Sequence, residues 1–179
     1  MKQTLVHDFA GAQSIQIMSA YFLPSLPILR ELKRAARRGA RVQLILAGKT
    51  DVWLMRLATR GLYISLLRAG VQVYEYKPQI LHAKLVIVDD VIFAGSANLD
   101  ARSLNINYEV LARIADRRLA AEARHIFTAD LKHCHRIDRR SLRHARGWWQ
   151  GLLERFAFFV LARFDPYVAR RQRHRLLNS

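Results

Sequence analysis

The order of apolar and amphipathic segments in the first 76 residues constrains the fold of this chain most strongly. Two amphipathic segments, residues 28–38 and about 51–69, have helical periodicity, and Gly70 follows the second one where a glycine commonly ends a helix. They alternate with three short segments that are typical of strands, at residues 14–20, 41–47 and 71–76. This strand–helix alternation predicts an α/β layered domain with at least some parallel pairing in its sheet.

Further elements follow in the next 60 residues. Residues 81–88 and 91–94 are predicted strands, and Asp89-Asp90 between them predicts a tight hairpin. Residues 106–114 predict another strand, and residues 116 to about 134 predict a helix. We therefore expect a mixed sheet that is flanked by helices.

The composition changes near residue 136. Residues 146–163 (RGWWQGLLERFAFFVLAR) combine aromatic and leucine side chains with arginines, which predicts an amphipathic helix. This helix either lies at a membrane interface or covers the core or a partner's site, and the sequence leaves both possibilities open. We divide the chain into a domain over residues 1–135 and a basic amphipathic helical extension over residues 136–179.

The charge of the chain indicates an anionic partner. The formal net charge is +16 at pH 7, which suits either nucleic acid or an anionic membrane surface. No apolar run reaches the roughly 18 residues of a spanning helix, and the N-terminus lacks the apolar core of a secretory signal. The single cysteine, Cys134, excludes an intramolecular disulfide and fits a reducing compartment. We expect a cytoplasmic protein that touches any membrane from one side.

Three adjacent side chains, His133, Cys134 and His135, raise the question of a metal site. Zinc sites usually need a second ligand pair at a regular spacing, and none follows here. We therefore predict no metal and interpret the cluster as the end of the helix over residues 116–134.

The residues that carry chemistry lie around the predicted hairpin. His82, Lys84 and Asp89 form the pattern HxKxxxxD, and Ser96 and Asn98 follow in the segment GSANLD. Strand side chains two residues apart project from one face, so His82 and Lys84 can point at the same substrate group. Phosphodiester transfer needs a nucleophile together with cations and donors that neutralise the phosphate oxygens. His82 fits the first role, Lys84 and Asn98 fit the second, and Ser96 can add a hydrogen bond to the phosphate or to the histidine.

The combination HAKLVIVDD followed by GSANLDARS resembles the signature of the phospholipase D superfamily, HxKxxxxD followed by GSxN. The resemblance to the second half of bacterial cardiolipin synthases extends over most of residues 14–134, including SAYFLPSLPILRELKRAARRGARVQLILAGKTD and NLDARSLNINYEV. It implies a phospholipase D-like mixed sheet that forms one catalytic half.

The resemblance also implies roles for individual residues. His82 would attack phosphorus and form a phosphohistidine, while Lys84 and Asn98 hold the phosphate oxygens without a metal or another cofactor. Asp89 would be structural or would orient a histidine, and Glu109 would hydrogen-bond the catalytic histidine. Residues at the mouth of the site would contact substrate: Tyr21, Phe22 and, on a nearby loop, Lys49.

The motif occurs once in this sequence, whereas cardiolipin synthases carry two copies. A second histidine would therefore come from the mate in a homodimer, or this sequence is a fragment or a separate subunit whose missing half lies elsewhere. The first hypothesis is phosphatidyl transfer to phosphatidylglycerol at the cytoplasmic face of the bacterial inner membrane, with an anionic phospholipid membrane as partner and no nucleic acid. A homodimeric nuclease of the same superfamily, or an inactive truncated remnant, is the alternative.

Overall fold

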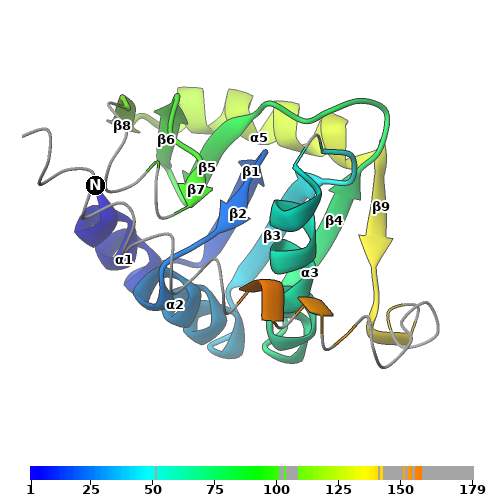
Figure 1. Ribbon diagram of the computed structural model, residues 1–179. Helices are drawn as coiled ribbons and strands as arrows, with labels where there is room; N and C mark the ends of the chain where they lie inside the picture. Colours follow the sequence, from blue (N-terminus) through cyan, green and yellow to red (C-terminus); the bar gives the residue numbers. More distant parts are fainter. Residues whose placement is uncertain are drawn as a thin grey trace, which may run out of the picture.

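A mixed seven-stranded sheet organises the described part of the chain (Figure 1). The computed structural model describes residues 1–50, 52–100, 103, 109–140, 142, 151, 153, 154 and 156–158. The strands lie in the order β8-β6-β5-β1-β3-β4-β9. Their bounds are β1 (Ser14–Ser19), β3 (Arg41–Ala47), β4 (Gln72–Tyr76), β5 (Lys84–Val88), β6 (Val91–Gly95), β8 (Leu111–Ala115) and β9 (Cys134–Ile137).

Four long helices and a second, small sheet complete the described fold. The helices are α1 (Lys2–Gly11), α2 (Leu26–Arg37), α3 (Trp53–Arg68) and α5 (Arg117–Leu131). The small sheet pairs β2 (Phe22–Leu23) with β7 (Leu99–Asp100) in parallel. The predicted mixed sheet flanked by helices is thereby confirmed.

Strands β1, β3 and β4 form a parallel core, and the remaining strands pair antiparallel on both sides of it. A ladder of buried amides fixes this register: Gln16 donates to Gln43 at 3.1 Å, and Gln43 donates to Gln72 at 2.9 Å. A slip by one residue would move each amide to the opposite face of the sheet and separate the three partners.

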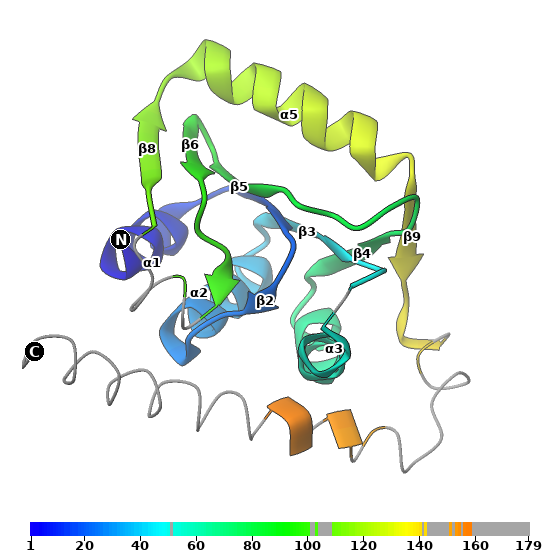
Figure 2. The same cartoon turned by 45° about the horizontal axis from the view of Figure 1, so that its top comes forward.

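The two faces of the sheet are covered unequally (Figure 2). Ile17 and Leu44 point to the main core, where they meet α1, α2 and α3. Met18 and Ile45, one residue further along each strand, point to the other face and meet Phe127 of α5. Successive side chains of a strand point to opposite faces, so each face of the sheet carries apolar residues. Both faces are therefore covered by helices.

Helix α1 is an element that the sequence analysis did not predict. Leu5 and Phe9 lie four residues apart and are both fully buried, so one face of the helix enters the main core. The polar residues between them hide this short apolar stripe when the sequence is read alone. Asp8 on the same helix accepts a hydrogen bond from Arg113 at 2.9 Å and so ties α1 to β8.

Most of the other predicted elements are confirmed within a few residues. Gly70 follows α3 with φ +95°, the left-handed conformation that favours glycine after a helix. The predicted strand over residues 106–114 is shifted, since β8 spans Leu111–Ala115 and residues 104–108 lie outside the described residues. The predicted helix after residue 116 ends at Leu131 rather than near residue 134.

Strand β9 corrects the prediction for the segment around Cys134. It pairs antiparallel with β4, and Ile137 is buried beside Val73. The open edge of β4 offers unpaired backbone groups, and this tertiary pairing overrides the helical pattern that precedes it. The predicted boundary between residues 135 and 136 falls within this strand.

Within the C-terminal extension, the described residues Ala157 and Phe158 pack against α3. Ala157 is buried with Leu23 and Ala58, and Phe158 packs against the same cluster. A Cβ atom on Gly61 would lie 2.7 Å from the carbonyl oxygen of Glu154, so the two segments touch at backbone distance. Leu153 and Phe156 are exposed, whereas Trp148, Trp149, Leu152 and Phe159 lie outside the described residues. Within the described residues, no helix combines the length and hydropathy that crossing a membrane requires.

Replacing Phe9 by Ala tests whether α1 is part of the core. We expect the free energy of unfolding to fall by about 3–5 kcal/mol, because the substitution leaves a cavity at a fully buried position. Urea titration measures the loss. His7→Ala on the same helix is the matched control, and its side chain is 89% exposed. Equal stability of the two variants would contradict the packing of α1.

Candidate functional site

The pairing of β5 with β1 places the predicted motif at one edge of the sheet. Lys84, the first residue of β5, lies opposite Ser19, the last residue of β1. Beyond this pair, the backbone of Ala20 donates to the carbonyl of Ala83 at 3.1 Å. Because β3 and β4 run parallel to β1, their carboxyl ends lie at this same edge. The motif therefore begins where loops gather in α/β proteins.

His82 and Lys84 are in direct contact at this edge. His82 lies two residues before β5 rather than within it, and it is exposed. The Lys84 ammonium lies 3.1 Å from His82 Nε2 and donates to the His82 carbonyl at 3.0 Å. An ammonium group only donates, so this contact fits a neutral imidazole that carries its proton on Nδ1 and a lone pair on Nε2.

Two opposing effects act on the pKa of Lys84. Partial burial lowers the pKa of Lys84, and the nearby carboxylate of Glu109 opposes this shift. Partial burial thus disfavours the charged form of Lys84, and an incoming phosphate anion would favour that form.

Ser96 joins Glu109 at the end of the hairpin. The Ser96 hydroxyl donates a short hydrogen bond to the Glu109 carboxylate, and it accepts one from the backbone of Val110 at 3.2 Å. A side chain on Gly95 would collide with the Val110 carbonyl, so only glycine permits this approach. The sequence analysis expected Ser96 to contact the phosphate or the histidine, but its hydroxyl donates to Glu109 instead.

Asn98 lies at the same edge and keeps an unused acceptor. The neighbouring backbone amide of Leu99 donates to Ser19 Oγ at 3.4 Å, which anchors this segment beside the pair of Ser19 and Lys84. Asn98 Oδ1 is buried and has no hydrogen-bond partner among the described residues. An unpaired buried acceptor is costly, and only a donor can pair with it, so a hydroxyl or another donor of the substrate rather than a phosphate oxygen would relieve this cost.

Asp89 does not lie with the other motif residues. It follows β5 at the end opposite Lys84, about 17 Å away at the rise of a strand. Its carboxylate accepts hydrogen bonds from the backbone of Ser14 at 2.8 Å and of Gln13 at 3.2 Å. Of the two roles that the resemblance implied, this geometry is the structural one: Asp89 fastens the hairpin to the start of β1.

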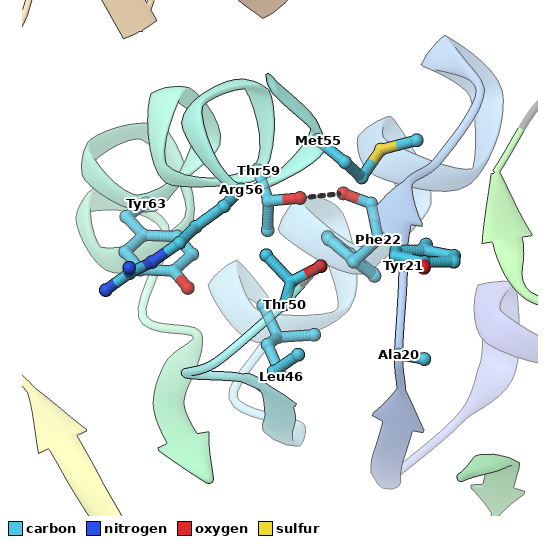
Figure 3. Close-up of a pocket in the computed structure, with 10 residues that line it drawn as sticks. Ala20, Tyr21, Phe22, Leu46, Thr50, Met55, Arg56, Thr59 and Tyr63 are labelled. Carbon is cyan, nitrogen blue, oxygen red and sulfur yellow. Dashed lines mark hydrogen bonds between the residues drawn. The ribbon is translucent and has the colours of Figure 1, made fainter. Parts of the chain in front are cut away.

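A small pocket lies between β2, the end of β3 and α3, and none of the motif residues lines it (Figure 3). Tyr21 and Phe22 line it from the β2 side, and Thr59 donates to the Phe22 carbonyl across it at 3.0 Å. Phe22 is only 1% exposed, so it serves the core as well as the pocket wall. Lys49 is not among the lining residues, because its ammonium donates to the carbonyl of Pro78 at 3.3 Å.

A buried polar group that the sequence analysis missed supports the pocket. Tyr63, a pocket residue, donates to the buried carboxylate of Glu75 at 3.2 Å, and Arg60 lies 3.6 Å from the same carboxylate. Burial raises the pKa of Tyr63, and the Glu75 charge adds to this effect. The one signal in the sequence is that Glu75 interrupts an apolar strand.

The cluster around Cys134 has no metal-site geometry. Cys134 and His135 are consecutive residues of β9, so their side chains point to opposite faces of the strand. No group of three metal-binding side chains occurs among the residues that the structure describes. Partial burial, together with the nearby Asp130, raises the pKa of the Cys134 thiol to about 11.

Comparisons with known proteins concern the chain as a whole rather than its individual site residues. A family model described as "Cardiolipin synthase, PLD-like domain" matches residues 5–131. Cardiolipin synthase B of Escherichia coli K12 is 37% identical over 161 residues, which cover 87% of this chain and 38% of that protein. Cardiolipin synthase A of Pseudomonas fluorescens is 36% identical, and the match covers 76% of this chain and 29% of that protein. The chain thus spans less than half the length of these relatives.

Solved structures show the same fold at lower sequence identity. Phosphatidylserine synthase of Haemophilus influenzae has a TM-score of 0.68 at 16% identity, and the match covers 92% of this chain and 43% of that one. Nuc of Salmonella typhimurium, a phospholipase D family member, has a TM-score of 0.61 at 18% identity, covering 76% of this chain and 90% of that one. At these identities the likeness concerns the fold alone.

The structural role of Asp89 predicts a stability defect in Asp89→Ala. We expect a loss of about 1–3 kcal/mol in the free energy of unfolding, because two backbone donors at the start of β1 lose their acceptor. The control is Asp90→Ala in the same turn, whose exposed side chain pairs with Arg124, and it should change stability by less than about 0.5 kcal/mol. Chemical denaturation measures the free energy of unfolding of both variants. An Asp89→Ala protein as stable as the wild type would refute the structural role of Asp89.

Proposed function

Since the chain belongs to the cardiolipin synthase family of phospholipase D-like domains, we propose that it forms one catalytic half of a phosphatidyltransferase of cardiolipin synthase type. The observation that carries this proposal is the contact between His82 Nε2 and the Lys84 ammonium at the loop-bearing edge of the sheet. It joins a nucleophile to a cation that can hold phosphate.

In the first step, His82 Nε2 attacks the phosphorus of a phospholipid. The N–P bond forms while the P–O bond to the headgroup alcohol breaks, and the alcohol leaves with a proton from an acid that the second catalytic half supplies. The proton on Nδ1 leaves a lone pair on Nε2, which attacks once the Lys84 ammonium has turned from Nε2 to the phosphate oxygens. The product is a phosphatidyl group bound to His82.

In the second step, the hydroxyl of phosphatidylglycerol attacks the same phosphorus. A new P–O bond forms while the N–P bond breaks, and the acceptor proton goes to the group that acted as the acid. The products are cardiolipin and regenerated His82. Lys84 and Asn98 bind the phosphate oxygens through both steps, and Ser96 keeps Glu109 close to Lys84.

The second half comes from a dimer mate, from a separate polypeptide, or from another part of a longer chain of which this sequence is a fragment. The chain carries one motif, and it spans 38% of the length of cardiolipin synthase B. The reaction as written needs a second acid and base, and among the described residues the side chain in contact with His82 Nε2 is that of Lys84, which serves to hold phosphate. A peripheral position at the cytoplasmic face of the inner membrane would give this site access to its lipids.

Incubation with phosphatidylglycerol vesicles tests the proposal. We expect the purified chain, alone or together with a polypeptide that carries the other motif, to form cardiolipin that mass spectrometry detects. His82→Ala should abolish product because it removes the nucleophile, whereas His125→Ala, at an exposed position on α5, should not. Product from His82→Ala would contradict the role of His82.

The same assay separates the possible partners. If two copies of this chain complete one site, an equal mixture of wild type and His82→Ala that has exchanged subunits retains about one quarter of the wild-type activity, since only that share of dimers is intact. Retention of one half indicates that each chain acts independently of its mate. Cleavage of single-stranded DNA without any transfer to lipid would favour the homodimeric nuclease, and no activity in either assay would favour the inactive remnant.

A further inference from the structure

Two loops lie side by side at the edge of the sheet that carries His82. One follows β3 and contains Gly48 and Lys49, and the other follows β4 and contains Lys77 and Pro78. Gly48 donates to the Tyr76 carbonyl at 2.9 Å, and the Lys49 ammonium donates to the Pro78 carbonyl at 3.3 Å. These bonds make the two loops one continuous surface.

This surface exposes large apolar side chains. Trp53, the first residue of α3, is 67% exposed, and Val52 before it is 42% exposed. Ile80, two residues before His82, is 57% exposed. A tryptophan and an isoleucine that face water beside a reactive site are costly unless something covers them.

Cations are exposed on the same loops and on the same helix as these apolar side chains. Lys49 and Lys77 are exposed on the two loops, and Arg56 is exposed one turn into α3. The turn before β9 adds the exposed Lys132, because Cys134 pairs with Tyr76 at the end of β4. Exposed aromatic and aliphatic side chains together with exposed cations on the same loops match the interface of an anionic bilayer.

We propose that this surface, formed by residues 48–50, 52, 53, 56 and 77–80 and named here the docking edge, binds an anionic lipid bilayer. Trp53 and Ile80 enter the headgroup region, and Lys49 and Lys77 contact lipid phosphates. Docking in this orientation presents His82 to the bilayer, so a phospholipid reaches the site without leaving the membrane. The inference rests on the proposed function, since a lipid substrate is the reason for docking at this edge.

Vesicle sedimentation tests the docking edge. The variant Trp53→Ser/Ile80→Ser should partition into phosphatidylglycerol vesicles about tenfold less than the wild type, because interfacial affinity follows the apolar area that is buried. The control is Ile126→Ser on α5, where Ile126 has the same 57% exposure as Ile80, and it should change partition less than about twofold. A second variant, Lys49→Gln/Lys77→Gln, should lose most of the preference for phosphatidylglycerol over phosphatidylcholine vesicles.

Several results would overturn the proposal. The first is wild-type protein that does not bind phosphatidylglycerol vesicles, and the second is a double serine variant that partitions as the wild type does. The third is a molar mass of that variant in light scattering that differs from the molar mass of the wild type. The last result would make the docking edge an interface between copies of this chain. Short-chain phosphatidylglycerol below its micelle concentration separates the docking hypothesis from the proposed function, because it is a soluble substrate. If vesicle binding depends on Trp53 and Ile80 but this substrate is not turned over, the result contradicts the proposed function and leaves the docking edge in place.

Discussion

The antiparallel pairing of β5 with β1 determines where chemistry can occur in this molecule. It places Lys84 opposite Ser19, at the edge where the parallel strands β1, β3 and β4 all end. Asp89 fastens the far end of the same strand to the backbone of Ser14. The motif residues therefore divide into a reactive group at one end of β5 and an anchor at the other. A shift of this register would separate His82 from the pocket and from the docking edge together.

Lys84, Asn98 and Glu109 of the reactive group differ in how their polar atoms are satisfied. Lys84 is a partly buried cation, Asn98 has a buried oxygen without a partner in the described structure, and Glu109 is held by Ser96. The burial of the Lys84 ammonium costs free energy in the absence of an anion, and a bound phosphate can recover part of that cost. In the same way, the exposed Trp53 and Ile80 are costly in water and favourable at a lipid interface.

Local patterns in the sequence predict much of this structure. Periodicity identified β1, β3, β4 and α3, and the motif identified His82 and Lys84, because these features depend on neighbours along the chain. The sequence analysis missed α1, whose stripe of Leu5 and Phe9 is short, and it extended the last predicted helix into β9. β9 forms because the backbone groups along β4 would otherwise have no partner on that side, and a local sequence pattern does not show which distant strand needs a partner. The partnership of Tyr63 with Glu75 is also a contact between separate elements.

Capture of a covalent intermediate is the most direct test of His82 as the nucleophile. The substrate is a phosphatidyl ester of p-nitrophenol, whose leaving group needs no acid, so a single catalytic half can react even without its complement. The N–P bond forms at His82 while p-nitrophenolate leaves, and digestion followed by mass spectrometry locates the acid-labile adduct. The account predicts a phosphatidyl group on the peptide that contains His82 and none on the His82→Ala protein. An adduct on another residue, or no adduct on the folded wild-type chain, would contradict it.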